Sequence, residues 1–246
     1  MPTLGAPANN RMDRMPSVKH AAPTPGAHSH ILRADPHPRR TLIVAAVAIV
    51  VLTLLGFLLR SHPVDQQLSQ AFNVLHTGAL GAVTSAVYVV IGPGPAIVGT
   101  ALVAVAIGFI GRHWHRAAAF AGVVALTWVP SDLVKILVDR PRPDAQALAH
   151  PTVPAAVDAS YPSGHTVFIV ALVIAALYLL AGTRWFRVGV IVGALFVAVV
   201  VLSVVIDGLH YPTDAVASVA WALLVAPAAR LVWVDWILAR FWPGRR

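Results

Sequence analysis

The chain alternates between long apolar runs and short polar segments. Six apolar runs stand out, at residues 41–59, 95–110, 117–138, 166–181, 188–206 and 215–237. A helix needs about 20 predominantly apolar residues to cross the hydrocarbon core of a bilayer, and the runs approach or reach that length. The pattern therefore predicts an all-α protein, an integral membrane bundle of six helices.

The region between the first two runs is less regular. Apolar residues recur at helical spacing among polar ones over 61–77, which predicts an amphipathic helix lying at the membrane interface. Residues 78–111 are apolar but contain Gly92-Pro-Gly-Pro95, which cannot continue a regular helix. Two interpretations remain: two short spans, or one span over about 95–110 preceded by an interfacial or re-entrant segment.

Arginine clusters beside the apolar runs indicate how the chain is threaded. They lie at 33–40, 112–116, 184–187 and 240–246. Counting residues 78–111 as one crossing places all of these clusters on one face, whereas two crossings would scatter them over both. Loops rich in Lys and Arg face the cytoplasm, so we expect both termini there.

This threading divides the chain into three parts. Residues 1–40 are rich in Pro, Ala, His and Arg without apolar periodicity, and predict a disordered cytoplasmic tail. Residues 41–240 form the membrane domain, and residues 241–246 form a short basic tail.

Composition supports this class and excludes others. The chain is 58% hydrophobic and only 11% charged, which is too apolar for a soluble domain of 246 residues. Cysteine is absent, which excludes disulfides and thiolate chemistry. The formal net charge of +8 comes from arginines placed as topology signals, so we expect contacts with membrane lipids and no nucleic-acid partner.

The predicted threading brings three polar segments to the external face, at 135–143, 161–165 and 203–214. No complete crossing separates the first two, and two crossings separate the second from the third. All three segments can therefore meet at one membrane surface.

Individually, the residues in these segments have plain structural interpretations. Lys135 lies where a lysine snorkels to the interface, and Arg142 is a flanking charge. Ser163 and Asp214 are residue types that cap helices. A lone histidine is more often packed or solvent-facing than catalytic.

Together, the same residues favour phosphoryl transfer. Arg and Lys bind phosphate oxygens, and the helix start at Ser163-Gly164 offers free N–H groups to an anion. His165 and His210 add two imidazoles, of which one can attack phosphorus while the other protonates the leaving oxygen. An aspartate beside the attacking histidine would orient it.

The three segments resemble the motifs of the type 2 phosphatidic acid phosphatase (PAP2) superfamily, membrane lipid phosphatases related to vanadium haloperoxidases. The motif Lys-x6-Arg-Pro stands here as Lys135 to Pro143, and Pro-Ser-Gly-His as Pro162 to His165. The motif Ser-Arg-x5-His-x3-Asp stands as Ser203 to Asp214. Order and spacing agree, within a resemblance that covers roughly residues 41–237.

The resemblance implies a role for each matching residue. His210 would be the nucleophile that forms a phosphohistidine, Asp214 its orienting partner and His165 the general acid. The phosphate would be bound by Lys135, Arg142, Ser163 and the Gly164 amide. The family needs no metal or other cofactor, and its substrates are lipid phosphates or diphosphates, such as polyprenyl diphosphates, phosphatidylglycerophosphate or phosphatidate.

One position departs from the family pattern. Val204 stands where the third motif has an arginine. Losing a charge-assisted hydrogen bond of ~1.5–3 kcal/mol would slow the reaction ~10- to 150-fold if the bond acts fully in the transition state. Arg140 is a candidate stand-in, and restoring arginine at position 204 should then raise activity.

The departure leaves other classes of function open. The chain can be a catalytically weak or silent relative that binds lipid phosphates or a membrane partner. A small transporter is disfavoured because the chain lacks obvious internal repeats and has few charges inside its spans. The pattern leaves the oligomeric state undetermined.

Overall fold

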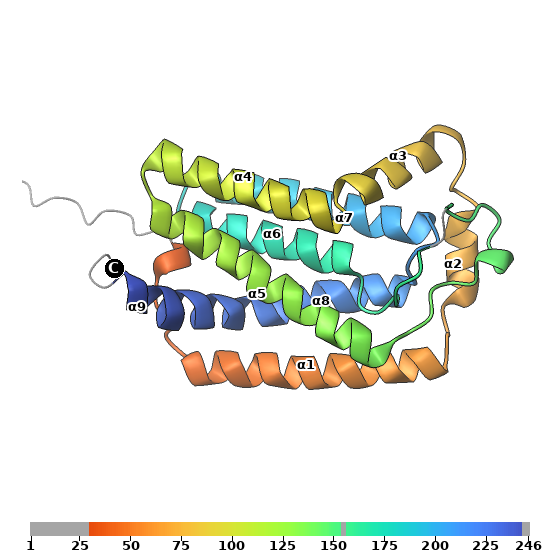
Figure 1. Ribbon diagram of the computed structural model, residues 1–246, viewed down its shortest axis with the longest axis horizontal. Helices are drawn as coiled ribbons and strands as arrows, with labels where there is room; N and C mark the ends of the chain where they lie inside the picture. Colours follow the sequence, from red (N-terminus) through yellow and green to blue (C-terminus); the bar gives the residue numbers. More distant parts are fainter. Residues whose placement is uncertain (1–29, 154–155, 243–246) are drawn as a thin grey trace, which may run out of the picture.

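The apolar runs fold into long helices that lie lengthwise in one bundle (Figure 1). The computed structural model describes residues 30–153 and 156–242, and no strand occurs among them. The long helices are α1 (Pro38–Ser61), α4 (Pro93–Gly111), α5 (Trp114–Val138), α6 (Gly164–Leu180), α7 (Phe186–Ile206) and α8 (Pro212–Arg230). A π-helical segment, η3 (Leu231–Leu238), and the short α9 (Ala239–Phe241) continue α8.

Most of these helices are suited to cross a membrane. Among the described residues, five helices are long and apolar enough to span: α1, α4, α5, α7 and the continuous helix from Pro212 to Phe241. The α6 helix is apolar but shorter, with 17 residues, and it packs against α5, α7 and α8. The predicted all-α membrane bundle is confirmed, and the protein is a multi-pass membrane protein.

The region that the sequence left ambiguous forms two helices. After α2 (Gln66–Asn73), α3 (Gly78–Val90) bends away by 119° and packs against α7. The chain breaks at Ile91-Gly92, and Pro93 opens α4. In Figure 1, α3 slopes from the α2 end toward the middle of the bundle, and α4 continues to the opposite end. Residues 78–111 thus pass from one end to the other once, which supports the single-crossing interpretation.

Part of the predicted disordered tail is ordered. Residues 1–29 lie outside the described part of the chain, but His30–Leu32 form the short helix η1 and Pro38 already begins α1. Ile31 is fully buried, and Arg230 donates to the backbone carbonyls of Ile31 and Arg33. A buried arginine needs acceptors for its N–H groups, so this contact anchors the segment against the bundle.

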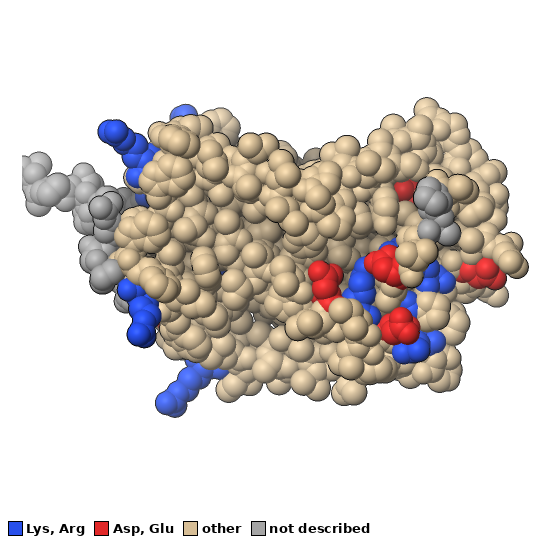
Figure 2. Space-filling view, in the orientation of Figure 1, with Lys and Arg blue, Asp and Glu red and all other residues tan. Residues whose placement is uncertain are grey.

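The two ends of the bundle differ in charge. Arg39, Arg112 and Arg184 lie at or near turns of one end, together with the C-terminal part of the chain. The opposite end carries α2, residues 139–153 and 156–163 between α5 and α6, and the turn between α7 and α8. Figure 2 shows acidic and basic side chains gathered toward this end beside a hollow, whereas the charged side chains at the other end are basic.

Candidate active site

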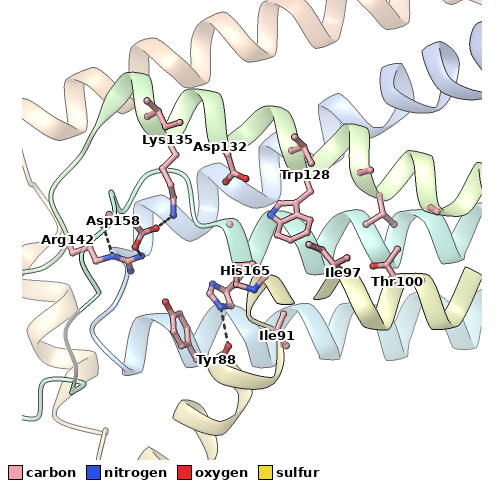
Figure 3. Close-up of a pocket in the computed structure, with 18 residues that line it drawn as sticks. Tyr88, Ile91, Ile97, Thr100, Trp128, Asp132, Lys135, Arg142, Asp158 and His165 are labelled. Carbon is pink, nitrogen blue, oxygen red and sulfur yellow. Dashed lines mark hydrogen bonds and ion pairs between the residues drawn. The ribbon is translucent and has the colours of Figure 1, made fainter. Parts of the chain in front are cut away.

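A cavity of about 760 Å³ opens between α3, α4, α5 and α6 (Figure 3). One part of its wall is polar, with Lys135, Arg142, Asp158 and His165. The rest is apolar, with Ile91, Ile97, Ala101, Val124 and Trp128 among its lining residues. The cavity therefore suits a molecule with an anionic head and an apolar body.

The two basic residues of the first motif converge on one carboxylate. Lys135 Nζ lies 2.6 Å from one oxygen of Asp158, and an Arg142 terminal nitrogen lies 2.7 Å from the other. Arg142 Nε also donates to the Asp158 carbonyl, over 3.0 Å. Lys135 and Arg142 together bind this carboxylate, and we call the two residues the anion site.

Sequence reasoning missed Asp158, which lies in the loop before the second motif. Burial alone would raise the pKa of Asp158, but the hydrogen bond from Lys135 and the charge of Arg142 outweigh it and hold the pKa well below its usual range. The loop is pinned by Ser160, whose N–H donates to the Arg140 carbonyl and whose hydroxyl donates to the Pro141 carbonyl. No motif spacing signals these contacts.

His210 is fully buried beside the anion site. Its Nδ1 lies 2.8 Å from the Ser160 carbonyl oxygen, and since a carbonyl only accepts, Nδ1 carries the hydrogen. Nε2 lies 3.3 Å from an Arg142 nitrogen. Burial and the charge of Arg142 lower the pKa of His210 to about 4, against an opposing effect of Asp214. The imidazole is therefore neutral at pH 7, and its Nε2 lone pair accepts from Arg142.

Asp214 is close to His210 but is bound mainly by other groups. Its Oδ2 lies 3.8 Å from His210 Nδ1, beyond hydrogen-bond length, and accepts the Tyr211 N–H at 2.9 Å. Its Oδ1 accepts from Arg140 at 2.5 Å. The structure thus places two acceptors near Nδ1, the Ser160 carbonyl in contact and the Asp214 carboxylate behind it.

Arg140 is the centre of a buried ion-pair network. Only 1% of Arg140 is exposed, and besides Asp214 it pairs with Asp65 at 2.8 Å. Its guanidinium also lies 3.9 Å from the centre of the Tyr211 ring. Arg140 does not line the cavity, and both of its terminal nitrogens donate to carboxylates.

The second motif opens α6 at the cavity wall. Gly164 and His165 line the cavity, whereas Ser163 is fully buried and its hydroxyl accepts from the Thr166 N–H at 3.4 Å, as in an N-cap. The His165 ring stacks on Tyr88 of α3, with centroids 4.1 Å apart. His165 Nε2 lies 3.1 Å from the Tyr88 carbonyl, which leaves Nδ1 for other partners.

Val204, the departure from the third motif, is fully buried in α7. It belongs to an apolar cluster with Val205 and Ala215, against which Tyr88 and Phe72 pack. Its carbonyl accepts from the N–H groups of Leu209 and His210, which shapes the turn that carries His210.

We also looked for side chains that could hold a metal ion. Within residues 30–153 and 156–242, no three His, Cys, Asp or Glu side chains gather closely enough to hold one. The positive charge at the site comes from Lys135 and Arg142.

The fold and the site define a class: a multi-pass helical membrane protein whose anion site adjoins an apolar cavity. Residues 116–237 match the family model described as the PAP2 superfamily, and all three motifs lie within the match. This part of the chain belongs to that superfamily, and the resemblance carried by the motifs is confirmed.

Two individual proteins are similar to this chain. The undecaprenyl-diphosphatase BcrC of Bacillus subtilis (strain 168) is 31% identical over 134 residues, which cover 53% of this chain and 65% of the relative. The crystal structure of a transmembrane PAP2 type phosphatidylglycerolphosphate phosphatase from Bacillus subtilis gives a TM-score of 0.63 at 16% identity. That match covers 82% of this chain and 98% of the other, and it shows a shared fold.

Proposed function

We propose that the protein is a membrane phosphatase that hydrolyses a lipid phosphate or diphosphate through a phosphohistidine. One observation carries the proposal: Lys135 and Arg142 hold a carboxylate between them, and Arg142 also contacts the ring of His210. In the reaction, a phosphate group takes the place of the Asp158 carboxylate. The apolar part of the cavity then receives the lipid.

In the first step, His210 Nε2 attacks phosphorus and the bond from phosphorus to the leaving oxygen breaks. The Nδ1–H, held by the Ser160 carbonyl, keeps the lone pair on Nε2. His165 takes up a proton when the phosphate anion binds and donates it from Nδ1 to the leaving oxygen, because its Nε2 is engaged by the Tyr88 carbonyl. Lys135, Arg142 and the amide of Gly164 stabilise charge on the remaining phosphate oxygens.

In the second step, water attacks the phosphohistidine. His165 takes a proton from that water, the bond between phosphorus and His210 Nε2 breaks, and inorganic phosphate leaves. Buried Ser163 supports this site by fixing the start of α6. The proposed chemistry requires no metal ion, since two side-chain cations supply the positive charge.

The substrate class follows from the cavity and from the relatives. Polyprenyl diphosphate, phosphatidylglycerophosphate and phosphatidate all combine a phosphate with a long apolar body. We place the site at the external membrane face and both termini in the cytoplasm, because the arginine-rich turns lie at the other end of the bundle.

The test is phosphate release from a panel of these three lipids by the purified protein. His210→Ala serves as the inactive control, because it removes the nucleophile. Release by the parent well above that of His210→Ala is the expected result, and trapping of a phosphorylated His210 would identify the intermediate. Equal release by both proteins would overturn the proposal.

Val204 favours a second candidate function. The chain can bind lipid phosphates with little turnover, because the third motif lacks its arginine. Lipid phosphate binding that depends on Lys135 and Arg142, without phosphate release above the His210→Ala background, would identify this function.

A further inference from the structure

The third motif differs from the family pattern at Val204, whose carbonyl accepts from the N–H of His210. The arginine of the motif would bring charge and several N–H donors, whereas valine brings neither. Val204 is fully buried, in the apolar cluster with Val205 and Ala215. A phosphate bound by Lys135 and Arg142 would therefore need another donor in place of this arginine.

The side chain of Tyr88 lies beside the apolar cluster that contains Val204. Its half-buried side chain packs against the Val204 cluster from α3 and lines the cavity. The phenol ring stacks on His165 with an angle of 23° between the rings. In Figure 3 the Tyr88 hydroxyl points toward the side of the cavity that holds Arg142 and Asp158, and it lies within electrostatic reach of both.

The local fold explains how a residue of α3 reaches the site. Tyr88 lies in the last turn of α3, just before the break at Ile91-Gly92, where α3 packs against α7 and Tyr88 contacts His165 at the start of α6. His165 Nε2 binds the Tyr88 carbonyl and the His165 ring stacks on the phenol, so both the backbone and the ring of Tyr88 are fixed to the second motif.

We propose that the Tyr88 hydroxyl binds a phosphate oxygen and stabilises its charge in the transition state, in the place left by the arginine absent at Val204. The inference rests on the proposed phosphatase function. A phenol donates one hydrogen bond and carries no charge. With Tyr88 in place of the motif arginine, the phosphate therefore keeps a hydrogen-bond donor at this position, but the site carries one positive charge fewer.

Tyr88→Phe tests this directly, since it removes the hydroxyl and keeps the ring that stacks on His165. We expect kcat/KM to fall ~10- to 150-fold, the range for a hydrogen bond to a charged group. The inhibition constant of inorganic phosphate should rise as well. The matched control is Tyr178→Phe, in another cavity lined by Pro227 and Arg230, which should leave both values unchanged. Activity and phosphate affinity equal to the parent in Tyr88→Phe would overturn the inference.

A second pair of variants separates phosphate binding from packing. Tyr88→Ala removes both ring and hydroxyl, and Tyr88→Ala/Val204→Arg places an arginine where the phenol was. We expect the double variant to regain part of the activity and phosphate affinity lost in Tyr88→Ala. A well-folded double variant without any regain of phosphate affinity would contradict a shared role for the two side chains.

The outcomes also separate this inference from the proposed function. If the parent releases no more phosphate than His210→Ala, the phosphatase proposal fails. Titration of parent and Tyr88→Phe with inorganic phosphate then still tests Tyr88, and equal affinities would reject it. If the parent is active and Tyr88→Phe matches it in both assays, only the Tyr88 inference fails.

Discussion

At the scale of single residues, the position of one hydrogen decides what His210 can do. The Ser160 carbonyl takes the Nδ1–H, and Arg142 lies beside Nε2. Burial and this neighbouring cation favour the neutral ring, while Asp214 opposes them in part. In the proposed mechanism, these contacts keep the ring neutral and the hydrogen on Nδ1 before any substrate binds.

We expect His210 to titrate near pH 4 in the folded protein, below the ~6.5 of a free imidazole. Because the folded pKa is lowered, the unfolded chain takes up the proton first. The free energy of unfolding should thus fall as the pH drops from ~6.5 toward 4. The measurement is NMR of labelled histidines in detergent, with His210→Asn identifying the signal. A midpoint near 6.5 would contradict the buried, Arg142-paired geometry.

In the proposed site, Asp158 would compete with phosphate for Lys135 and Arg142. Replacing it by the neutral Asp158→Asn frees Lys135 and Arg142, so inorganic phosphate should inhibit more strongly, by ~3- to 10-fold, as expected for partly exposed ion pairs. The matched control is Asp139→Asn, which removes an exposed pair with Arg60 outside the cavity. Unchanged or weaker phosphate inhibition in Asp158→Asn would show that the carboxylate does not occupy the phosphate site.

At the scale of elements, a buried ion-pair network joins α2 to α8. Asp65, just before α2, accepts from Arg140 and from the N–H and hydroxyl of Thr213 at the start of α8. Arg140 also holds Asp214. The short helix α2 is thus linked to the segment that carries the third motif.

Arg140→Ala separates anchoring from direct phosphate binding. It leaves Asp65 and Asp214 buried without their cation, which typically costs about 3–5 kcal/mol of folding free energy. We expect a marked fall in thermal stability, partly reversed by adding Asp65→Asn, which removes one of the unpaired carboxylates. If Arg140 were the stand-in for the missing arginine, Arg140→Ala would instead lose phosphate affinity at unchanged stability. An Arg140→Ala variant as stable and active as the parent would exclude both roles.

The sequence predicts the helices better than it predicts the individual contacts at the site. The helices and the gathering of three polar segments at one end were predictable, because spanning length and crossing parity are properties of the linear pattern. The Ser160 carbonyl, Asp158 and Tyr88 were not, because they reach the site through the loop path and the break between α3 and α4. The burial of Ile31 also escaped prediction, because Arg230, which donates to the Ile31 carbonyl, lies far along the chain.

At the scale of the whole molecule, the distribution of charge predicts an orientation in the membrane. The natural chain has no cysteine, so single cysteines can report on each end. Ala147→Cys lies in an exposed, short 3-10 helix (Ala145–Ala147) at the end of the bundle with the site. His113→Cys lies in the exposed turn between α4 and α5 at the other end. The positive-inside rule places the second turn in the cytoplasm. A membrane-impermeant maleimide applied to intact cells should therefore label Ala147→Cys, and should label His113→Cys only after permeabilisation. The reverse pattern would place the proposed phosphatase site, and the lipid head groups it can reach, on the cytoplasmic face.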